Sequence, residues 1–262
     1  MKQTGLLFAL THNYTGYPLV KEARDIVVSG KLGKIRKIVV EYPQGGLATR
    51  VEDTGNKRAI WRTDPARSGP ANCMADIGTH AENLAEYVTG LKITKLCADL
   101  TTFVEGRRLD DDGSVLLRFD GGARGILHAS KVCAGEENAL RLRVYGEKGG
   151  LEWDQMQPNS LTMKWPDRPV EIYRTGARYL SEMAKLGARL PAGHPEGFIE
   201  AFANIYRNFL STLRARLEGK EPAPEHLDFP TVHDGVRGMA FIETVVESAR
   251  SERKWTKFKE FE

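Results

Sequence analysis

The sequence predicts an α+β fold in which a mainly antiparallel, open β-sheet is covered by helices on one face. Two observations support this prediction. From residue 92 to residue 171, short β-like runs follow one another and are separated by glycine-rich turns, a pattern typical of consecutive hairpins. The segments on either side instead carry apolar residues at helical spacing. Strands and helices segregated in this way favour a sheet with helices on one side.

The N-terminal segment predicts one strand followed by one helix. Leu6 to Leu10 form a short apolar run, which is typical of a buried strand. Pro18 suits the first turn of a helix, and apolar residues then recur at helical spacing until Gly30. The first 33 residues therefore predict a single strand–helix unit.

The rest of the chain alternates between strand, loop and helix signals. Residues 35–42 predict a strand, and the polar stretch 44–71, rich in Gly, Pro and Arg, predicts a long loop. The acidic run 110–112 is interpreted as a solvated turn. Helices are expected over 73–88, 195–217 and 232–251. Strands are expected over 93–104, 114–119, 123–132, 139–146 and 151–153.

The composition favours a protein whose partners are small molecules. The 262 residues suffice for one large domain or two small ones. The 38 basic and 35 acidic side chains leave a net charge of only +3, so neither nucleic acid nor an anionic membrane is expected as a partner. Three widely spaced cysteines without a C-x-x-C pair, and the lack of a long apolar run, favour the cytoplasm.

Motifs that bind a dinucleotide are absent from the sequence. Such folds need a glycine-rich turn whose backbone amides, with the N-terminus of the next helix, hold the pyrophosphate. No two glycines are two positions apart, which excludes G-x-G-x-x-G, and the pattern G-x-x-x-x-G-K-[ST] does not occur either. We therefore do not expect these residues to build a complete cofactor domain.

The strongest chemical signal is the segment SGPANCMADIGTH, residues 68–80. Asp76 and His80 are four positions apart, so on a helix they share one face with Cβ atoms about 5–6 Å apart. Gly78 between them lets a ligand or another backbone approach closely. A carboxylate that orients an imidazole is an acid–base unit. The alternative is a capping aspartate beside a hydrogen-bonded histidine, and the spacing alone favours that alternative.

Six segments occur in a fixed order along the chain: THNYTGYPLVKEARDIVVSGKLGKI, WRTDPARSG, DIGTH, VLLRFDGGARG, LRLRVYGEKGGLEW and HPEGFIEAFANIY. Together they resemble the Gfo/Idh/MocA family of NAD(P)-dependent oxidoreductases. The resemblance implies that residues 34–262 form a substrate-binding and oligomerisation domain with a dihydrodipicolinate reductase-like sheet. It implies that residues 1–33 are the last strand and helix of a Rossmann domain. NAD or NADP is the implied cofactor, and we do not expect this chain to bind it alone.

The resemblance also implies roles for individual residues. Asp76 and His80 match the catalytic D-x-G-x-H motif, with His80 as the acid–base group and Asp76 as its orienter or a substrate contact. Gly78 of the same motif is placed in the substrate site. The family's catalytic lysine stands in a Glu-Lys-Pro motif and has no counterpart here, because neither Lys148 nor Lys220 lies in such a motif.

Five further residues are candidates for ligand contacts. His12 and Asn13 are expected to bind the cofactor and Tyr14 the substrate, since family members approach both ligands at this point; a simple turn stabilised by Asn13 remains an equal alternative. The planar guanidinium of Arg62 can bind a carboxylate or hydroxyl-rich substrate. His194, before a long helix, is expected to reach the substrate. No metal site is expected, because no short cluster such as H-E-x-x-H occurs.

These expectations lead to one function and leave alternatives. The leading interpretation is the substrate domain of an NAD(P)-dependent dehydrogenase for a sugar, polyol or related hydroxy compound, inactive without a separate Rossmann domain. A non-catalytic binding or oligomerisation module derived from the same family is the alternative, and a cofactor-independent lyase or isomerase is a third. Expected partners are the substrate, a Rossmann-domain chain, and further copies of this chain in a homodimer or tetramer through the sheet face.

Overall fold

A nine-stranded sheet organises the structure, which is a computed structural model that describes residues 3–261. The strands are β1 (Ile35–Pro43), β2 (Ile93–Thr101), β3 (Asp112–Phe119), β4 (Arg124–Ser130), β5 (Arg141–Gly146), β6 (Gly150–Asp154), β7 (Ser160–Lys164), β8 (Glu171–Arg174) and β9 (Thr256–Lys257). Their spatial order is β8-β7-β6-β5-β1-β4-β3-β2-β9. The first strand of the sequence thus lies in the middle of the sheet.

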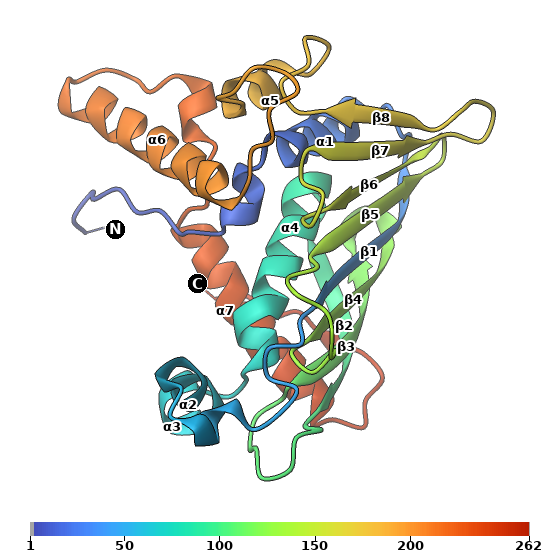
Figure 1. Cartoon of the computed structure of the whole chain (residues 1–262), viewed down its shortest axis with the longest axis vertical. Helices are drawn as coiled ribbons and strands as arrows, with labels where there is room; N and C mark the ends of the chain where they lie inside the picture. Colours follow the sequence, from blue (N-terminus) through green and yellow to red (C-terminus); the bar gives the residue numbers. More distant parts are fainter. Residues whose placement is uncertain (1–2, 262) are drawn as a thin grey trace.

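Helices cover one face of this sheet (Figure 1). They are α1 (Pro18–Val28), α2 (Lys57–Thr63), α3 (Pro65–Ser68), α4 (Thr79–Thr89), α5 (Glu182–Gly187), α6 (Phe198–Leu217) and α7 (Val232–Ala249). A π-helical turn, Met74–Gly78, precedes α4, and short 3₁₀ turns span Asn13–Gly16, Val51–Thr54, Asp120–Gly122 and Pro224–Leu227. α4 packs on β1 and α7 on β2. Within residues 3–261, no helix combines the length and the hydropathy of a membrane span.

The sheet is mixed, which corrects the prediction of a mainly antiparallel sheet. β1 lies between β4 and β5 and pairs parallel with β4 and antiparallel with β5. A parallel pair needs a long crossover connection, which α4 and the β2–β3 hairpin provide here. Hairpin turns reveal only strands that are neighbours in sequence, so they gave no indication of this pairing.

The alternation of side chains along the strands separates the covered face from the open one. In β3, Val115, Leu117 and Phe119 are buried, whereas Leu116 points the other way and is 46% exposed. Because successive side chains in a strand point to opposite faces, this pattern buries every second residue under the helices. The sheet therefore has one face buried under the helices and one solvated face.

The strand predicted over Leu6–Leu10 is not formed. This segment is irregular, with one backbone hydrogen bond from Leu10 to the Pro230 carbonyl (2.9 Å), and Leu6 is 68% exposed. Strands of a parallel sheet are stabilised by neighbouring strands on both sides, and residues 3–261 contain none beside this segment. The helix of the predicted strand–helix unit, α1, is present with Pro18 in its first turn.

The segment 44–71, predicted as a long loop, contains α2 and α3. The Asn56 side chain accepts a hydrogen bond from the Ala59 backbone N–H (3.0 Å) and caps α2, and Asp64 caps α3 in the same way through Ala66 (3.1 Å). Both helices are short and expose most of their side chains. They therefore lack the apolar stripe by which a longer helix is identified in a sequence.

Candidate functional site

A cavity of about 520 Å³ lies where the π-helical turn, α2, α6 and the ends of β1 and β4 meet. We call it the acid–base cavity. Five of the predicted site residues line it together: Asn13, Tyr14, Arg62, Asp76 and His80. Among the other lining residues are Tyr42, Lys131 and Asn138.

Two buried aspartates hold the chain that leads into the cavity, which corrects the interpretation of 110–112 as a solvated turn. Asp110 and Asp111 are 7% and 0% exposed. The Asp110 carboxylate accepts hydrogen bonds from the backbone N–H groups of Asn72 (2.7 Å) and Met74 (2.8 Å). Asp111 pairs with Arg107 at 3.3 Å. Because buried carboxylates need such partners, they anchor the start of the π-helical turn that carries Asp76.

Asp76 is paired with two cations. Its carboxylate lies 2.9 Å from Lys131 Nζ and also forms an ion pair with Arg62. Lys131 donates a second hydrogen bond to Asn72 Oδ1 (2.7 Å) and is only 2% exposed. Burial lowers the pKa of Lys131, and the charge of Asp76 opposes that change. No hydrogen bond or ion pair joins Asp76 to His80 among the described residues, so the structure shows no direct contact by which Asp76 would orient the imidazole.

Lys131 is one of the residues of this site that sequence reasoning missed, together with Tyr42 and Asn138. Lys131 directly follows β4, in which Gly125, Leu127 and Ala129 are buried. Because side chains alternate along a strand, the same pattern directs residue 131 inward. An inward-facing lysine at the end of a buried strand was the available signal, since lysine is almost never fully buried unless paired.

His80 is contacted by His12. Their Nδ1 atoms are 3.1 Å apart, and the two rings are perpendicular. Tyr14 packs edge-on against His80, with ring centres 5.1 Å apart. Burial, and secondly the neighbouring His12 ring, lower the pKa of His80 to about 3. The imidazole is therefore neutral near pH 7, and its Nε2 has no partner among the described residues. His12, predicted as a cofactor contact, is not among the cavity-lining residues and lies behind His80.

Neutral hydroxyl and amide groups form the opposite wall. The Tyr14 and Tyr42 hydroxyls share a hydrogen bond. Asn138 accepts from the Tyr42 hydroxyl (2.7 Å) and from Gln44 Nε2 (2.6 Å), and it donates to Tyr14 (3.2 Å). Burial raises the pKa of both tyrosines, so the hydroxyls stay protonated. Such a wall offers donors and acceptors without charge, which suits a hydroxyl-rich ligand.

Asn13 has an unpaired donor at the same cavity. It is 2% exposed, and its Nδ2 has no hydrogen-bond partner among the described residues. An unpaired buried donor is costly, so a ligand carbonyl or hydroxyl oxygen would be stabilised here. The carboxamide of a nicotinamide fits this donor. The rest of a dinucleotide has no glycine-rich cradle in the sequence.

Two predicted substrate contacts lie outside the cavity wall. A Cβ atom at Gly78 would lie 2.7 Å from Met74 Sδ and 3.5 Å from the Phe241 ring. The glycine therefore permits packing between the π-helical turn and α7, which corrects its assignment to ligand binding. His194 is exposed in the loop before α6, with Nδ1 3.1 Å from the Pro191 carbonyl.

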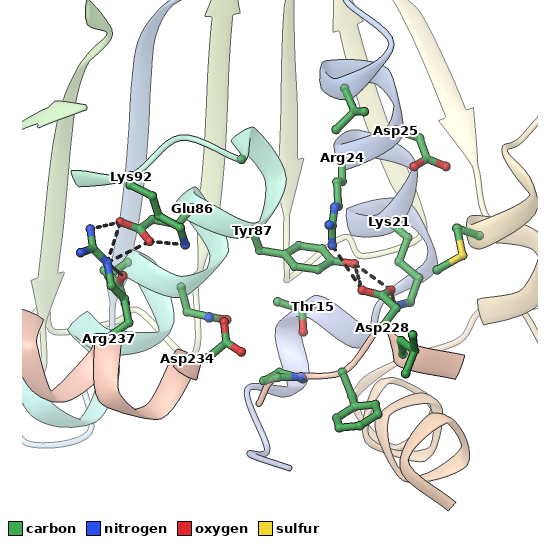
Figure 2. A pocket seen from close by; sticks show the side chains of 18 of the residues that line it. Thr15, Lys21, Arg24, Asp25, Glu86, Tyr87, Lys92, Asp228, Asp234 and Arg237 are labelled. Atoms are coloured by element: carbon green, nitrogen blue, oxygen red, sulfur yellow. Dashed lines mark hydrogen bonds and ion pairs between the residues drawn. The ribbon is translucent and has the colours of Figure 1, made fainter. Parts of the chain in front are cut away.

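A second space of about 620 Å³ lies farther along α4, bounded by α1, α7 and the segment 224–230 (Figure 2). We call it the ion-pair hollow. Asp228 accepts a hydrogen bond from the Tyr87 hydroxyl (2.9 Å) and pairs with Lys21 and Arg24. On the opposite side, Glu86 pairs with two cations. These are Arg237 (2.7 Å) and Lys92 (2.8 Å). Both carboxylates join elements that are distant in the sequence.

Comparison with known proteins agrees with this fold. The model of the GFO/IDH/MocA C-terminal domain matches residues 20–152, just over half of the chain. The uncharacterized oxidoreductase YfiI of Bacillus subtilis is 31% identical over 260 residues, covering 98% of this chain and 66% of the relative.

Solved structures show the same similarity. An inositol dehydrogenase homolog from Azotobacter vinelandii, complexed with NAD+, superposes with a TM-score of 0.90 at 33% identity, covering 96% of this chain and 65% of that chain. An inositol dehydrogenase homolog from that organism is also known in complex with NADH and myo-inositol. It superposes with a TM-score of 0.86 at 32% identity, covering 96% of this chain and 64% of that chain. An oxidoreductase from Sinorhizobium meliloti superposes with a TM-score of 0.86 at 39% identity, covering 98% of this chain and 66% of that chain.

The chain thus spans slightly less than two thirds of the length of these relatives. Matches to the domain model and to a relative at 31% identity come from different comparisons, and they agree. The chain belongs to the Gfo/Idh/MocA family of oxidoreductases.

Proposed function

We propose that this chain is the substrate-binding part of an NAD(P)-dependent dehydrogenase that acts on a sugar, a polyol or a related hydroxy compound. The acid–base cavity carries this proposal, because a neutral imidazole, an ionised carboxylate and neutral hydroxyl groups face one space of about 520 Å³. The relatives support it, since an inositol dehydrogenase homolog at 32% identity is known with NADH and myo-inositol.

The cavity residues suit the proton transfer that accompanies oxidation of an alcohol. His80 is neutral, so Nε2 accepts the proton of the substrate hydroxyl. Arg62 donates hydrogen bonds to neighbouring hydroxyls, and Asp76 accepts them while Lys131 holds it in place. The nicotinamide, when bound, accepts the hydride. The unpaired Asn13 Nδ2 would hold its carboxamide.

We further propose that the dinucleotide is bound mainly by a Rossmann domain that these 262 residues do not form. The lack of a glycine-rich fingerprint supports this. Apolar side chains at the cavity add support, because Phe198, which lines it, is 47% exposed and the adjacent Ile199 is 77% exposed. Exposed apolar surface of this kind is typical of a docking site for another domain.

Calorimetry and steady-state kinetics test these proposals separately. The chain alone should bind a polyol such as myo-inositol, and NADH only weakly. With a dinucleotide-binding domain supplied, it should oxidise a member of a polyol and sugar panel, and His80→Gln should lower kcat by about 10²–10⁴-fold. The exposed His233 offers a matched control. Tight NADH binding by the chain alone would contradict the Rossmann proposal, and failure to bind any polyol or sugar would contradict the substrate proposal.

Oligomerisation through the open face of the sheet is a second candidate function. Leu116 and Ile126 are paired across β3 and β4 and are 46% and 36% exposed, and Ile172 on β8 is 51% exposed. Apolar side chains on the solvent face of a sheet favour contact with a second copy. Sedimentation should then give a dimer or tetramer that Leu116→Glu dissociates, and a monomer at all concentrations would exclude this role.

A further inference from the structure

His12 contacts His80 of the acid–base cavity through its ring and Thr15 of the ion-pair hollow through its backbone. On one side its Nδ1 contacts His80, which lines the cavity. On the other side its carbonyl accepts a hydrogen bond from Thr15 Oγ1 (2.9 Å), and Thr15 lines the hollow together with Asp234 of α7 (Figure 2). The two imidazoles are thus joined to each other by a polar contact, and the Asp234 carboxylate of the hollow acts on His12 through its charge.

The chemistry of the contact restricts the protonation of both rings. At 3.1 Å the two Nδ1 atoms are within hydrogen-bond distance, so one carries a proton and the other accepts it. A proton on both Nδ1 atoms would place two donors against each other. Either ring can be the donor, and the shared proton can move from His80 to His12 without leaving an anionic ring only when His80 gains a proton at Nε2.

We propose that His80 and His12 form a proton relay that carries the substrate hydroxyl proton away from the acid–base cavity. The relay rests on the proposed function, which supplies the substrate and the hydride acceptor. The substrate O–H bond breaks and its proton binds His80 Nε2. The Nδ1–H bond of His80 breaks, and that proton binds His12 Nδ1. The cationic His12 then releases its Nε2 proton to water, and both rings are neutral again.

The electrostatics of the two rings favour this direction of transfer. A histidine with a pKa of about 3 does not retain a proton near neutral pH. Around His80, Asp76 raises the pKa and Arg62 lowers it, while burial dominates both. Burial also lowers the pKa of His12, but the Asp234 carboxylate opposes that change. The positive charge is thus better stabilised at His12 than at His80.

The other groups that face the two rings are uncharged. Tyr14 and Tyr42 pack against the His80 ring at 5.1 and 6.5 Å between ring centres. Their pKa values are raised by burial, so both stay neutral. They shield His80 from water on their side. Transfer to His12 therefore remains the route by which His80 loses the proton.

Side-chain ¹⁵N NMR of the full chain tests the relay without any need for turnover. We expect a scalar coupling between the Nδ1 nuclei of His12 and His80 through their hydrogen bond, with His80 in the Nδ1–H tautomer and His12 in the Nε2–H tautomer at neutral pH. His12→Gln should abolish the coupling, and His233→Gln should not change it. Both rings in the Nε2–H tautomer would overturn the relay, because no proton would then lie between the Nδ1 atoms.

A second variant tests the His12 end of the relay. Asp234 accepts a hydrogen bond from the Thr231 backbone N–H at the start of α7, and the amide oxygen of Asp234→Asn can accept it too. Removing the charge should lower the pKa of His12, because Asp234 raises it. An unchanged titration of His12 in a folded Asp234→Asn protein would contradict the assigned direction of transfer.

Kinetics separate this inference from the proposed function. In the active dehydrogenase, His12→Gln should lower kcat about tenfold or more at unchanged KM and shift its pH profile. Activity that His12→Gln leaves unchanged would overturn the relay and leave the proposed function intact. An intact Nδ1–Nδ1 coupling without dehydrogenase activity in any condition would overturn the proposed function instead.

Discussion

The acid–base cavity and the ion-pair hollow both border α4, but they differ in how their polar groups are satisfied. In the hollow, Asp228 and Glu86 are saturated by donors from several elements. In the cavity, His80 Nε2 and Asn13 Nδ2 have no partner among the described residues. The hollow is the larger of the two, about 620 against 520 Å³.

This difference separates a structural network from a ligand site. Buried charges that are fully paired hold elements together and leave little for a ligand to bind. Buried donors and acceptors that lack partners instead gain free energy when a ligand satisfies them. Volume alone would have favoured the ion-pair hollow as the ligand site. The predictions below test the distinction by comparing unfolding free energy with ligand affinity, measured for the polyol or sugar that binds in the screen described above.

Asp228→Ala should have the largest effect on stability and little effect on affinity. It leaves Lys21, which is 3% exposed, without its counterion. Removal of one partner from a buried pair costs about 3–5 kcal/mol. Urea unfolding measures the loss, and Asp25→Ala, from the same hollow but without an ion pair among the described residues, should change stability by less than about 0.5 kcal/mol. A large loss of ligand affinity at unchanged stability would reverse the assignment of the hollow.

The pH dependence of stability should report the buried His80. Its pKa is about 3 in the folded chain against an ordinary 6.5, so below pH 6.5 the unfolded chain binds a proton that the folded chain does not. The unfolding free energy should therefore fall as the pH falls from about 6.5 towards 3. Urea unfolding across this range should show a weaker dependence for His80→Gln. An equal pH dependence of the unfolding free energy in the unmodified chain and in His80→Gln would show that the His80 ring is not desolvated.

Gly78→Ala should destabilise the π-helical turn by about 1–3 kcal/mol, as expected for an overpacked core. The added methyl group would lie 2.7 Å from Met74 Sδ. In a double-mutant cycle with Met74→Ala, the double variant should lose less than the sum of the single losses. Gly46→Ala is the control, because no other atom lies within 4 Å of its added Cβ. Strict additivity would argue against the contact as the reason for the glycine.

Arg62→Gln should have the smallest effect on stability and a clear effect on affinity. Arg62 is 21% exposed, and Asp76 keeps its ion pair with Lys131, so the unfolding free energy should change by less than about 1 kcal/mol. Loss of one hydrogen bond to the ligand should weaken binding about tenfold. Calorimetry measures this change, with Arg67→Gln as a control at a more exposed arginine of α3. Unchanged affinity would place the substrate elsewhere.

Local patterns in the sequence predicted much of the fold. The helix expected over 232–251 is α7, and the strand expected over 114–119 lies within β3. The long-range pairing of β1 with β4 and the short helices α2 and α3 could not be predicted. The β1–β4 pairing depends on contacts between segments far apart in the chain. The helices α2 and α3 are too short to show an apolar stripe in the sequence.

Within the candidate site, too, some features follow from the sequence and others only from the tertiary structure. Sequence spacing and the family resemblance indicated Asp76 and His80, and both line the cavity. Their partners are decided by tertiary structure, since His12 contacts His80, and Arg62 and Lys131 bind Asp76 from separate parts of the chain. A residue's type and position determine what chemistry it can perform. Its protonation and orientation depend on burial and neighbouring charges, which exist only once distant segments have packed together.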